Sequence, residues 1–104
     1  MRLENFKRGD TFFFSADIDD GYGNPLSLDI GSIRSQIRNS RDELISELDV
    51  SVGDVAGRYI FKDSNTQGWS LGELYMDIEV TQDEIVTSSP TIVIPVVRDI
   101  TKNE

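Results

Sequence analysis

The regular alternation of apolar and polar residues from Ser70 to Thr81 constrains the fold more than any other stretch. One parity is apolar and the other polar: Leu74, Met76, Ile78 and Val80 against Glu73, Tyr75, Asp77 and Glu79. Successive side chains of a β-strand point to opposite faces of its sheet, so this pattern indicates one buried and one solvated face. We therefore expect a strand near the middle of an antiparallel sheet.

Other segments show the same two-residue period and are separated by turn residues. The predicted strands lie within Met1 to Gly9, Thr11 to Ile18, Ile33 to Asn39, Leu44 to Val52, Arg58 to Lys62 and Thr91 to Val97. Polar connections are expected from Asp63 to Gly68 and from Gln82 to Pro90. About seven short strands at regular spacing predict an all-β, antiparallel β-sandwich. The 104 residues fit one domain, 1–104, with a polar tail at 98–104 that can fray.

The segment from Ser40 to Leu48 has a second interpretation. It can form one amphipathic helix, with Ser40 as the N-cap and Glu43 at the third position of a capping box. The strict alternation that continues to Val52 favours a strand instead.

The composition excludes several classes of function. The chain has no Cys and no His, which removes thiolate and imidazole nucleophiles, zinc-type ligand sets and the usual proton shuttle near neutral pH. Its net charge of −9 argues against nucleic acid and anionic membranes as partners, because affinity for phosphate surfaces comes from clustered Lys and Arg. No apolar run long enough to span a membrane and no cleavable signal pattern is found.

The stretch from Asp17 to Asn24 has the look of a calcium loop, because closely spaced carboxylates and glycine can surround a hard cation with oxygen atoms. Leu28 stands at the twelfth position, where an EF-hand loop needs a carboxylate. Asp20-Gly21 followed by Gly-Asn-Pro favours an ordinary turn. We expect no metal site and no other cofactor.

Pairs of carboxylates elsewhere give no signal for catalysis. Asp19 and Asp20 lie in a predicted turn, while Glu73 and Asp77 lie on a solvated strand face. Acid–base catalysis needs carboxyl groups whose pKa is shifted by their surroundings, and nothing in the sequence supplies such a shift. The chain is therefore predicted to be non-enzymatic, with no catalytic residue.

Two arginines, Arg34 and Arg38, form the outward row of the strand from Ile33 to Asn39. We expect this strand to lie antiparallel beside the strand from Leu74 to Val80, in one sheet. The two arginines would then lie opposite two of the acids Glu73, Asp77 and Glu79. Such exposed pairs contribute about 0.2–1 kcal/mol each and help to set the register.

The stretch from Ile92 to Val97 is apolar on both parities. A sandwich buries one face of such a strand, and Pro95 has no N–H, so we expect a strand at or near a sheet edge whose second face meets another protein chain. Phe13 is a large aromatic on the solvated face of its strand. The candidate interface residues are Phe13, Val93, Pro95 and Val97. Alternatively, a bulge at Pro95 switches the parity, or the loop from Gln82 to Ser89 and the N-terminal segment cover the second face.

Trp69 is the one tryptophan of the chain and follows a polar loop. A buried indole contributes a large apolar area, so we expect Trp69 to close one end of the core. A sugar-stacking role lacks a second aromatic residue nearby.

Three short motifs resemble immunoglobulin-like sandwich modules of phage tails and baseplates. They comprise Asp20-Gly21 leading through Pro25-Leu26 to Leu28 and Ile33, then Ala56-Gly57-Arg58, and finally Leu71-Gly72 with Asp77-Ile78. Leu74 departs from the pattern, since this family often has Tyr there. The chain is similar to the N-terminal domain of phage baseplate upper proteins. The resemblance implies an immunoglobulin-like fold and a structural virion protein, made in the bacterial host cytoplasm, whose partners are other virion proteins and copies of itself. The alternative is an immunoglobulin-like binding or display module of a bacterial surface protein.

Overall fold

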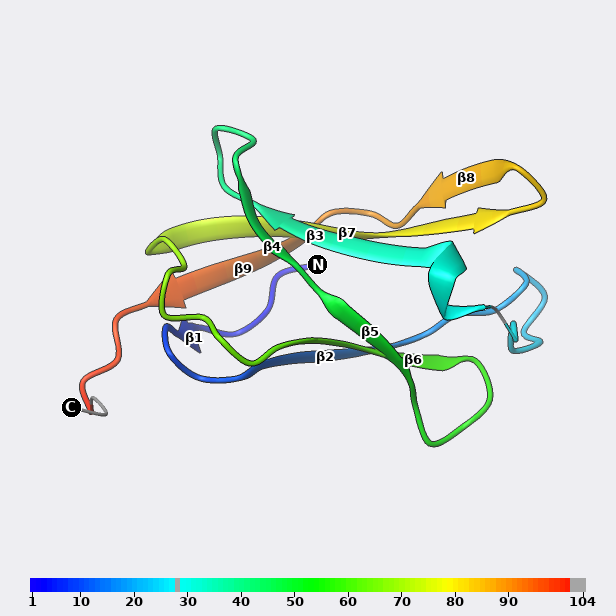
Figure 1. Cartoon of the computed structure of the whole chain (residues 1–104), viewed down its shortest axis with the longest axis horizontal. Helices are drawn as coiled ribbons and strands as arrows, with labels where there is room; N and C mark the ends of the chain where they lie inside the picture. Colours follow the sequence, from blue (N-terminus) through cyan, green and yellow to red (C-terminus); the bar gives the residue numbers. More distant parts are fainter. Residues whose placement is uncertain (28, 102–104) are drawn as a thin grey trace.

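The computed structural model describes residues 1–27 and 29–101 and forms an all-β sandwich, as the alternating patterns predict (Figure 1). The strands are β1 (Phe6–Lys7), β2 (Phe12–Asp17), β3 (Ile33–Arg38), β4 (Leu44–Glu47), β5 (Asp49–Val52), β6 (Arg58–Asp63), β7 (Gly72–Gln82), β8 (Ile85–Ser88) and β9 (Ile92–Val97), with a 3₁₀ helix at Ile30–Ser32. Leu28 and the end of the predicted tail, 102–104, lie outside the described residues.

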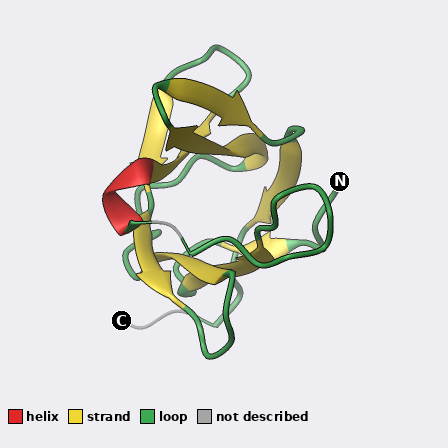
Figure 2. Ribbon diagram, turned by 90° about the vertical axis from the view of Figure 1, so that its right-hand side faces the viewer, coloured by secondary structure: helices red, strands yellow, loops and turns green. Residues whose placement is uncertain are grey.

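The strands form two sheets that enclose the core (Figure 2). One sheet has the order β1-β9-β7-β3-β4, with β8 also paired to β7, and the other has the order β2-β6-β5. All pairs are antiparallel except β1 with β9, which run parallel. The two sheets therefore differ in size, with six strands facing three.

The predicted central strand is confirmed as β7, which lies between β3 and β9. Its apolar row points into the core, and the side chains of Leu74 and Met76 are almost completely buried. Inner rows from the neighbouring strands complete the core, including Phe12, Ile33, Ile37, Tyr59, Phe61, Ile92, Ile94 and Val96. Burial of these apolar side chains is the main force that holds the two sheets together.

In the segment 44–52, Ser46, Leu48 and Val50 point inward as predicted, but Leu44 and Val52 are exposed. The prediction of one strand is wrong, and so is the helical alternative. β4 pairs with β3 in the larger sheet, and β5 pairs with β6 in the smaller one. Leu48 lies between them with its side chain buried, where the extended chain crosses the core from one sheet to the other. The crossing closes this side of the sandwich, which local alternation cannot reveal because side-chain parity does not change there.

The predicted polar connection from Gln82 to Pro90 is also wrong, since it contains β8. The pairs Glu79–Ser88 and Met76–Ile92 leave two residues between them on β7, 77 and 78, but three on the returning chain, 89–91. One extra residue is a β-bulge, and it reverses the parity between β8 and β9. The Ser89 side chain completes the ladder, because its Oγ accepts the Ile78 N–H at 2.9 Å.

β3 and β7 are antiparallel neighbours in one sheet, as predicted. The register sets Arg34 opposite Glu79, but Arg38 lies opposite Tyr75, so the prediction of two acid partners on β7 is half wrong. The Arg34 guanidinium forms its ion pair with Glu47 of β4, at 3.0 Å. Gln36 donates to the same carboxylate, and this bond together with the Arg34 bond lowers the pKa of Glu47.

Trp69 closes one end of the core, as predicted, with a side chain that is 2% exposed. Its ring lies 5.3 Å from the rings of both Phe6 and Phe12. The indole N–H donates to the carboxylate of Asp63, which also accepts the Ser46 hydroxyl. The hydrogen-bonded N–H and the packing of the ring on two aromatic side chains together allow the whole indole to be buried.

Candidate functional site

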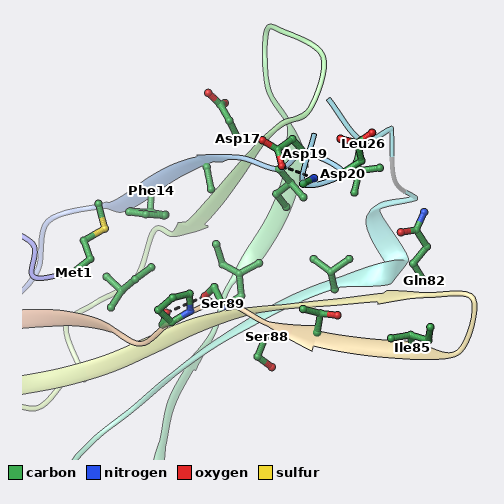
Figure 3. A pocket seen from close by; sticks show the side chains of 18 of the residues that line it. Met1, Phe14, Asp17, Asp19, Asp20, Leu26, Gln82, Ile85, Ser88 and Ser89 are labelled. Carbon is green, nitrogen blue, oxygen red and sulfur yellow. Dashed lines mark hydrogen bonds between the residues drawn. The ribbon is translucent and has the colours of Figure 1, made fainter. Parts of the chain in front are cut away.

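The end of the sandwich opposite Trp69 is open and contains a groove of about 930 Å³ (Figure 3). Phe14 and Ala16 of β2 form one wall, together with Ile18, which follows the strand, and Leu26. The facing wall comes from the larger sheet, with Ile78 and Val80 of β7, Ile85 of β8 and Ile92 of β9. Phe14 and Leu26 lie across the open space from Ile85 and Ser89 (Figure 3). The groove is therefore a gap between the two sheets with apolar walls.

The groove exists because the sheets are unequal. β2 pairs with β6 on one side, and no strand among residues 1–27 and 29–101 pairs with its other side. The smaller sheet therefore ends at β2, while the larger sheet continues beneath the opening to β8. Side chains of β7 and β8 that would be covered in a sandwich of equal sheets face the opening instead.

One wall of the groove belongs to a projecting hairpin, residues 79–88, which we call the arm. It consists of the end of β7 and all of β8, and it extends beyond the body of the sandwich (Figure 1). All four residues of β8 are exposed, including Ile85 at 67% and Val86 at 58%. In the β7–β8 register, Ile85 lies on the groove side and Val86 on the other face. The arm thus presents an apolar residue to solvent on each face.

The arm turns through Asp83 and Glu84, which have φ angles of 52° and 65°. Positive φ at both central residues is the geometry of a two-residue type I′ turn, whose twist fits a β-hairpin. Asn-Gly and Asp-Gly are the usual sequences for this turn, and the left-handed region costs an ordinary residue roughly 1–2 kcal/mol. The hairpin was missed because Asp-Glu does not resemble a turn of this type. The available signal was the β-branched run that follows, Ile85-Val86-Thr87.

The rim of the groove is acidic. Asp17, Asp19, Asp20 and Asp83 contribute to the lining, which contains no Lys or Arg among the described residues. A hydrogen bond of 2.8 Å from the Arg58 side chain lowers the pKa of Asp17. The backbone N–H of Tyr22, and then the side chain of Asn24, lower the pKa of Asp20. Both carboxylates are therefore charged at neutral pH.

The stretch from Asp17 to Asn24 is a compact turn, as predicted. Asp20 accepts the N–H groups of Tyr22 and Asn24, and Asp19 accepts the N–H of Gly21. These bonds are the usual way in which Asp stabilises a turn. Within the described ranges, no three Asp, Glu, His or Cys side chains are grouped so that they can hold a metal ion.

The four predicted interface residues do not form one surface. Phe13 is 60% exposed on the outer face of the smaller sheet. Val93, Pro95 and Val97 lie on the outer face of the larger sheet, where Pro95 is buried and the other two are half-buried. The prediction of a strand near a sheet edge is confirmed, because only the short β1 lies beyond β9.

The N-terminal segment pairs with the edge of β9, whereas the second alternative expected it to cover the strand's second face together with residues 82–89, which form the arm. The Val93 N–H donates to the Met1 carbonyl and the Val93 carbonyl accepts the Leu3 N–H, both at 2.9 Å. Arg2 lies beside Val93 and pairs with Glu73, which lies opposite Pro95 across the strand, so the ion pair spans the outer face of β9. The other alternative, a bulge at Pro95, is wrong, because the bulge lies at 89–91.

Comparisons with protein-family models, curated proteins and solved structures find no match for this chain. No helix in the described part of the chain is both long and apolar enough to cross a membrane.

The lowered carboxylate pKa values predict a loss of stability in acid. Arg2 lowers the pKa of Glu73 from its ordinary value of 4.5, and Arg58 lowers that of Asp17 from 3.8. A carboxylate whose pKa is lower in the folded state stabilises that state fully above its ordinary pKa, and the contribution is lost as the pH falls through the lowered value. We expect the melting temperature to stay constant between pH 7 and about pH 5 and to decrease below about pH 4.

The double variant Asp17→Asn/Glu73→Gln provides the measurement. Its melting temperature, followed by circular dichroism between pH 7 and pH 2.5, should fall less steeply below pH 4 than that of the wild type. Equal slopes for the two proteins would show that these two ion pairs do not contribute to acid unfolding.

Proposed function

We propose that this chain is a non-enzymatic protein-binding module that assembles through the arm, and that it is a component of a phage or prophage tail or baseplate. The observation that carries the proposal is the exposure of Ile85 and Val86 on opposite faces of a projecting hairpin. A two-stranded hairpin is marginally stable in water by itself, and an exposed β edge with apolar side chains favours pairing with another chain. A partner that covers the arm would bury both residues.

The tail and baseplate part of the proposal rests on the resemblance of the turn motifs. Two of these motifs meet in space, because a Cβ at Gly57 would lie 2.7 Å from the Cβ of Pro25. The Ile18 N–H also donates to the Gly57 carbonyl, at 2.8 Å. Two of the turn motifs on which the resemblance rests therefore contact one another at the groove end of β2.

We expect the wild-type chain to self-associate, so that its average mass in sedimentation velocity rises with concentration. The variant Ile85→Thr/Val86→Thr keeps β-branched residues that favour a strand but removes apolar surface, and it should associate about tenfold more weakly. Phe13→Thr is the matched control, because it removes an equally exposed apolar residue from the opposite sheet, and its association should equal that of the wild type.

Two outcomes would contradict the proposal. A wild-type chain that stays monomeric over the whole concentration range does not assemble with itself. Association that is lost in Phe13→Thr but kept in the arm variant would place the interface on the smaller sheet. Both variants must have the melting temperature of the wild type, so that a change in association is not caused by a loss of folding.

A further inference from the structure

We propose that the groove binds one extended segment of a partner protein, which adds to the smaller sheet as a fourth strand beside β2 and carries Lys or Arg on either side of alternating apolar residues. This inference rests on the proposed function, a protein-binding module, and names the chemistry of the partner. Three features support it: an unpaired strand edge, an uncovered apolar wall and an acidic rim.

The backbone of β2 has hydrogen-bonding groups that face the opening. The Ile18 N–H, one residue beyond β2, donates to the Gly57 carbonyl, one residue before β6, and the two residues continue the register of the Asp17–Arg58 pair. Hydrogen-bonded pairs of the β2–β6 ladder therefore fall on Phe14 and Ala16. Such pairs alternate along an antiparallel ladder, and the N–H and C=O groups of the intervening residues point away from the partner strand. In β2 the intervening residues are Phe13, Ser15 and Asp17. Their backbone groups are therefore available to an added strand, which is a common mode of peptide recognition.

The apolar wall provides contacts for the side chains of the added strand. A neighbouring strand would lie about 4.8 Å from β2, and every second side chain would point between the sheets. There it would meet Val80 and Ile85, which the three-stranded sheet leaves partly or largely exposed. The groove volume of about 930 Å³ lies within the range of roughly 300–1,000 Å³ that is typical of ligand sites.

The acidic rim determines the charge of the partner. Asp17, Asp19 and Asp20 lie at one end of the groove, and Asp83 lines it from the arm. Arg58 pairs with Asp17, but the described lining has no Lys or Arg, and the chain as a whole carries a net charge of −9. A strand from a second copy would bring further negative charge to this rim, whereas basic residues on either side of the apolar ones would be attracted. The occupant that fits is a basic segment of a different protein.

The probe is a fluorescein-labelled peptide, acetyl-Arg-Val-Thr-Val-Thr-Val-Lys-amide, measured by fluorescence anisotropy with the full chain. We expect saturable binding that weakens as salt is raised, since exposed charges are screened. A peptide with Glu at both ends should bind about tenfold more weakly. A peptide that is N-methylated on the three valines blocks strand pairing from one edge, and methylation of the two threonines blocks the other edge. One of the two should lose binding about tenfold.

The protein variant Ala16→Lys places a long cationic side chain in the groove from the middle of β2, and it should reduce binding of the basic peptide about tenfold. Phe13→Thr, on the outer face of the same strand, is the control and should bind as the wild type does. Melting temperatures of both variants show whether the fold is retained. Should Ala16→Lys unfold the chain, Ile85→Thr on the facing wall replaces it with the same expected direction.

Each contrary outcome is decisive. No binding up to 1 mM peptide, or equal binding of the acidic peptide, overturns the proposed partner chemistry. Full binding by both N-methylated peptides overturns strand addition and leaves an apolar cleft that accepts peptide without pairing. Self-association of the wild type is measured by sedimentation velocity without peptide. Failure of peptide binding therefore leaves the proposed assembly through the arm intact, and failure of self-association leaves the proposed peptide binding intact.

Discussion

Replacing Trp69 by alanine is expected to lower the free energy of unfolding by about 3–5 kcal/mol, the usual cost of truncating a buried aromatic residue. The indole is 2% exposed and packs on Phe6 and Phe12. Its removal leaves a cavity that β1 and β2 cannot fill without moving the turn between them. It also removes the hydrogen bond from Nε1 to Asp63. Urea unfolding followed by circular dichroism measures the change.

Trp69→Phe is the matched control. It keeps an aromatic ring beside Phe6 and Phe12 but lacks the N–H donor, so a smaller loss of about 1–2 kcal/mol is expected. Asp63 still accepts the Ser46 hydroxyl and the Asn65 N–H, and its carboxylate is not left without partners. If the free energy of unfolding of Trp69→Ala differs from that of the wild type by less than about 1 kcal/mol, the loss is no larger than that of one hydrogen bond. That result would show that the indole does not close this end of the core.

Gly57→Ala is expected to destabilise the chain by about 2–5 kcal/mol, because two effects add at this position. Gly57 is buried with a φ of 80°, a conformation that disfavours any residue with a Cβ. The new Cβ would lie 2.7 Å from the Cβ of Pro25 and 3.0 Å from the carbonyl oxygen of Ile18. The backbone of β2 would have to shift at the groove end.

Gly21→Ala separates the two effects. Gly21 has a similar φ of 88°, but no atom lies within 4 Å of the Cβ that alanine would add. Gly21→Ala should therefore lower the free energy of unfolding only by the cost of the positive φ, about 1–2 kcal/mol. The difference between the two variants, measured in the same urea titration, gives the cost of the close contact. Equal losses at both positions would mean that the contact with Pro25 relaxes freely.

Side-chain direction was the property best predicted from sequence. The inner rows of β2, β3, β6 and β7 were all assigned correctly, and so was the exposure of Phe13. In 44–52, where one predicted strand is divided between two sheets, the inward positions of Ser46, Leu48 and Val50 were right, whereas Leu44 and Val52 are exposed. Alternation is a local property of extended chain, and it depends only on whether each residue meets core or water.

Pairing partners were predicted less well. Arg34 was expected to pair with an acid of β7 and instead forms its ion pair with Glu47, since β4 lies on the other side of β3. Glu73 was one of three acids predicted as possible partners for the arginines of β3, and it pairs with Arg2, because the N-terminal segment lies along β9. In each case the sequence offered several oppositely charged residues as possible partners. Only the strand order selects among them.

The candidate groove was not predicted at all, although most of its apolar residues were assigned to the core side. Phe14, Ala16 and Ile18 point inward as expected, yet they face an opening because the smaller sheet ends at β2. The predicted interface residues of β9 lie apart from Phe13, because they are on the outer face of the other sheet, and the N-terminal segment pairs with the edge of β9. Whether a strand lies at a sheet edge, and whether another segment covers it, depends on which strands lie beside it. The strand's own sequence does not contain that information.

The sequence by itself determined that this chain is an all-β protein, which residues of β2, β3, β6 and β7 face the core, and that Trp69 closes one end of it. These properties depend on each segment's own pattern of apolar and polar residues. Only the tertiary structure decided that Leu48 crosses between the sheets, that a bulge at 89–91 reverses the parity before β9, and that six strands face three. The groove and the projecting arm follow from that inequality, because backbone groups and apolar side chains at a sheet edge stay uncovered wherever the opposite sheet supplies no neighbouring strand.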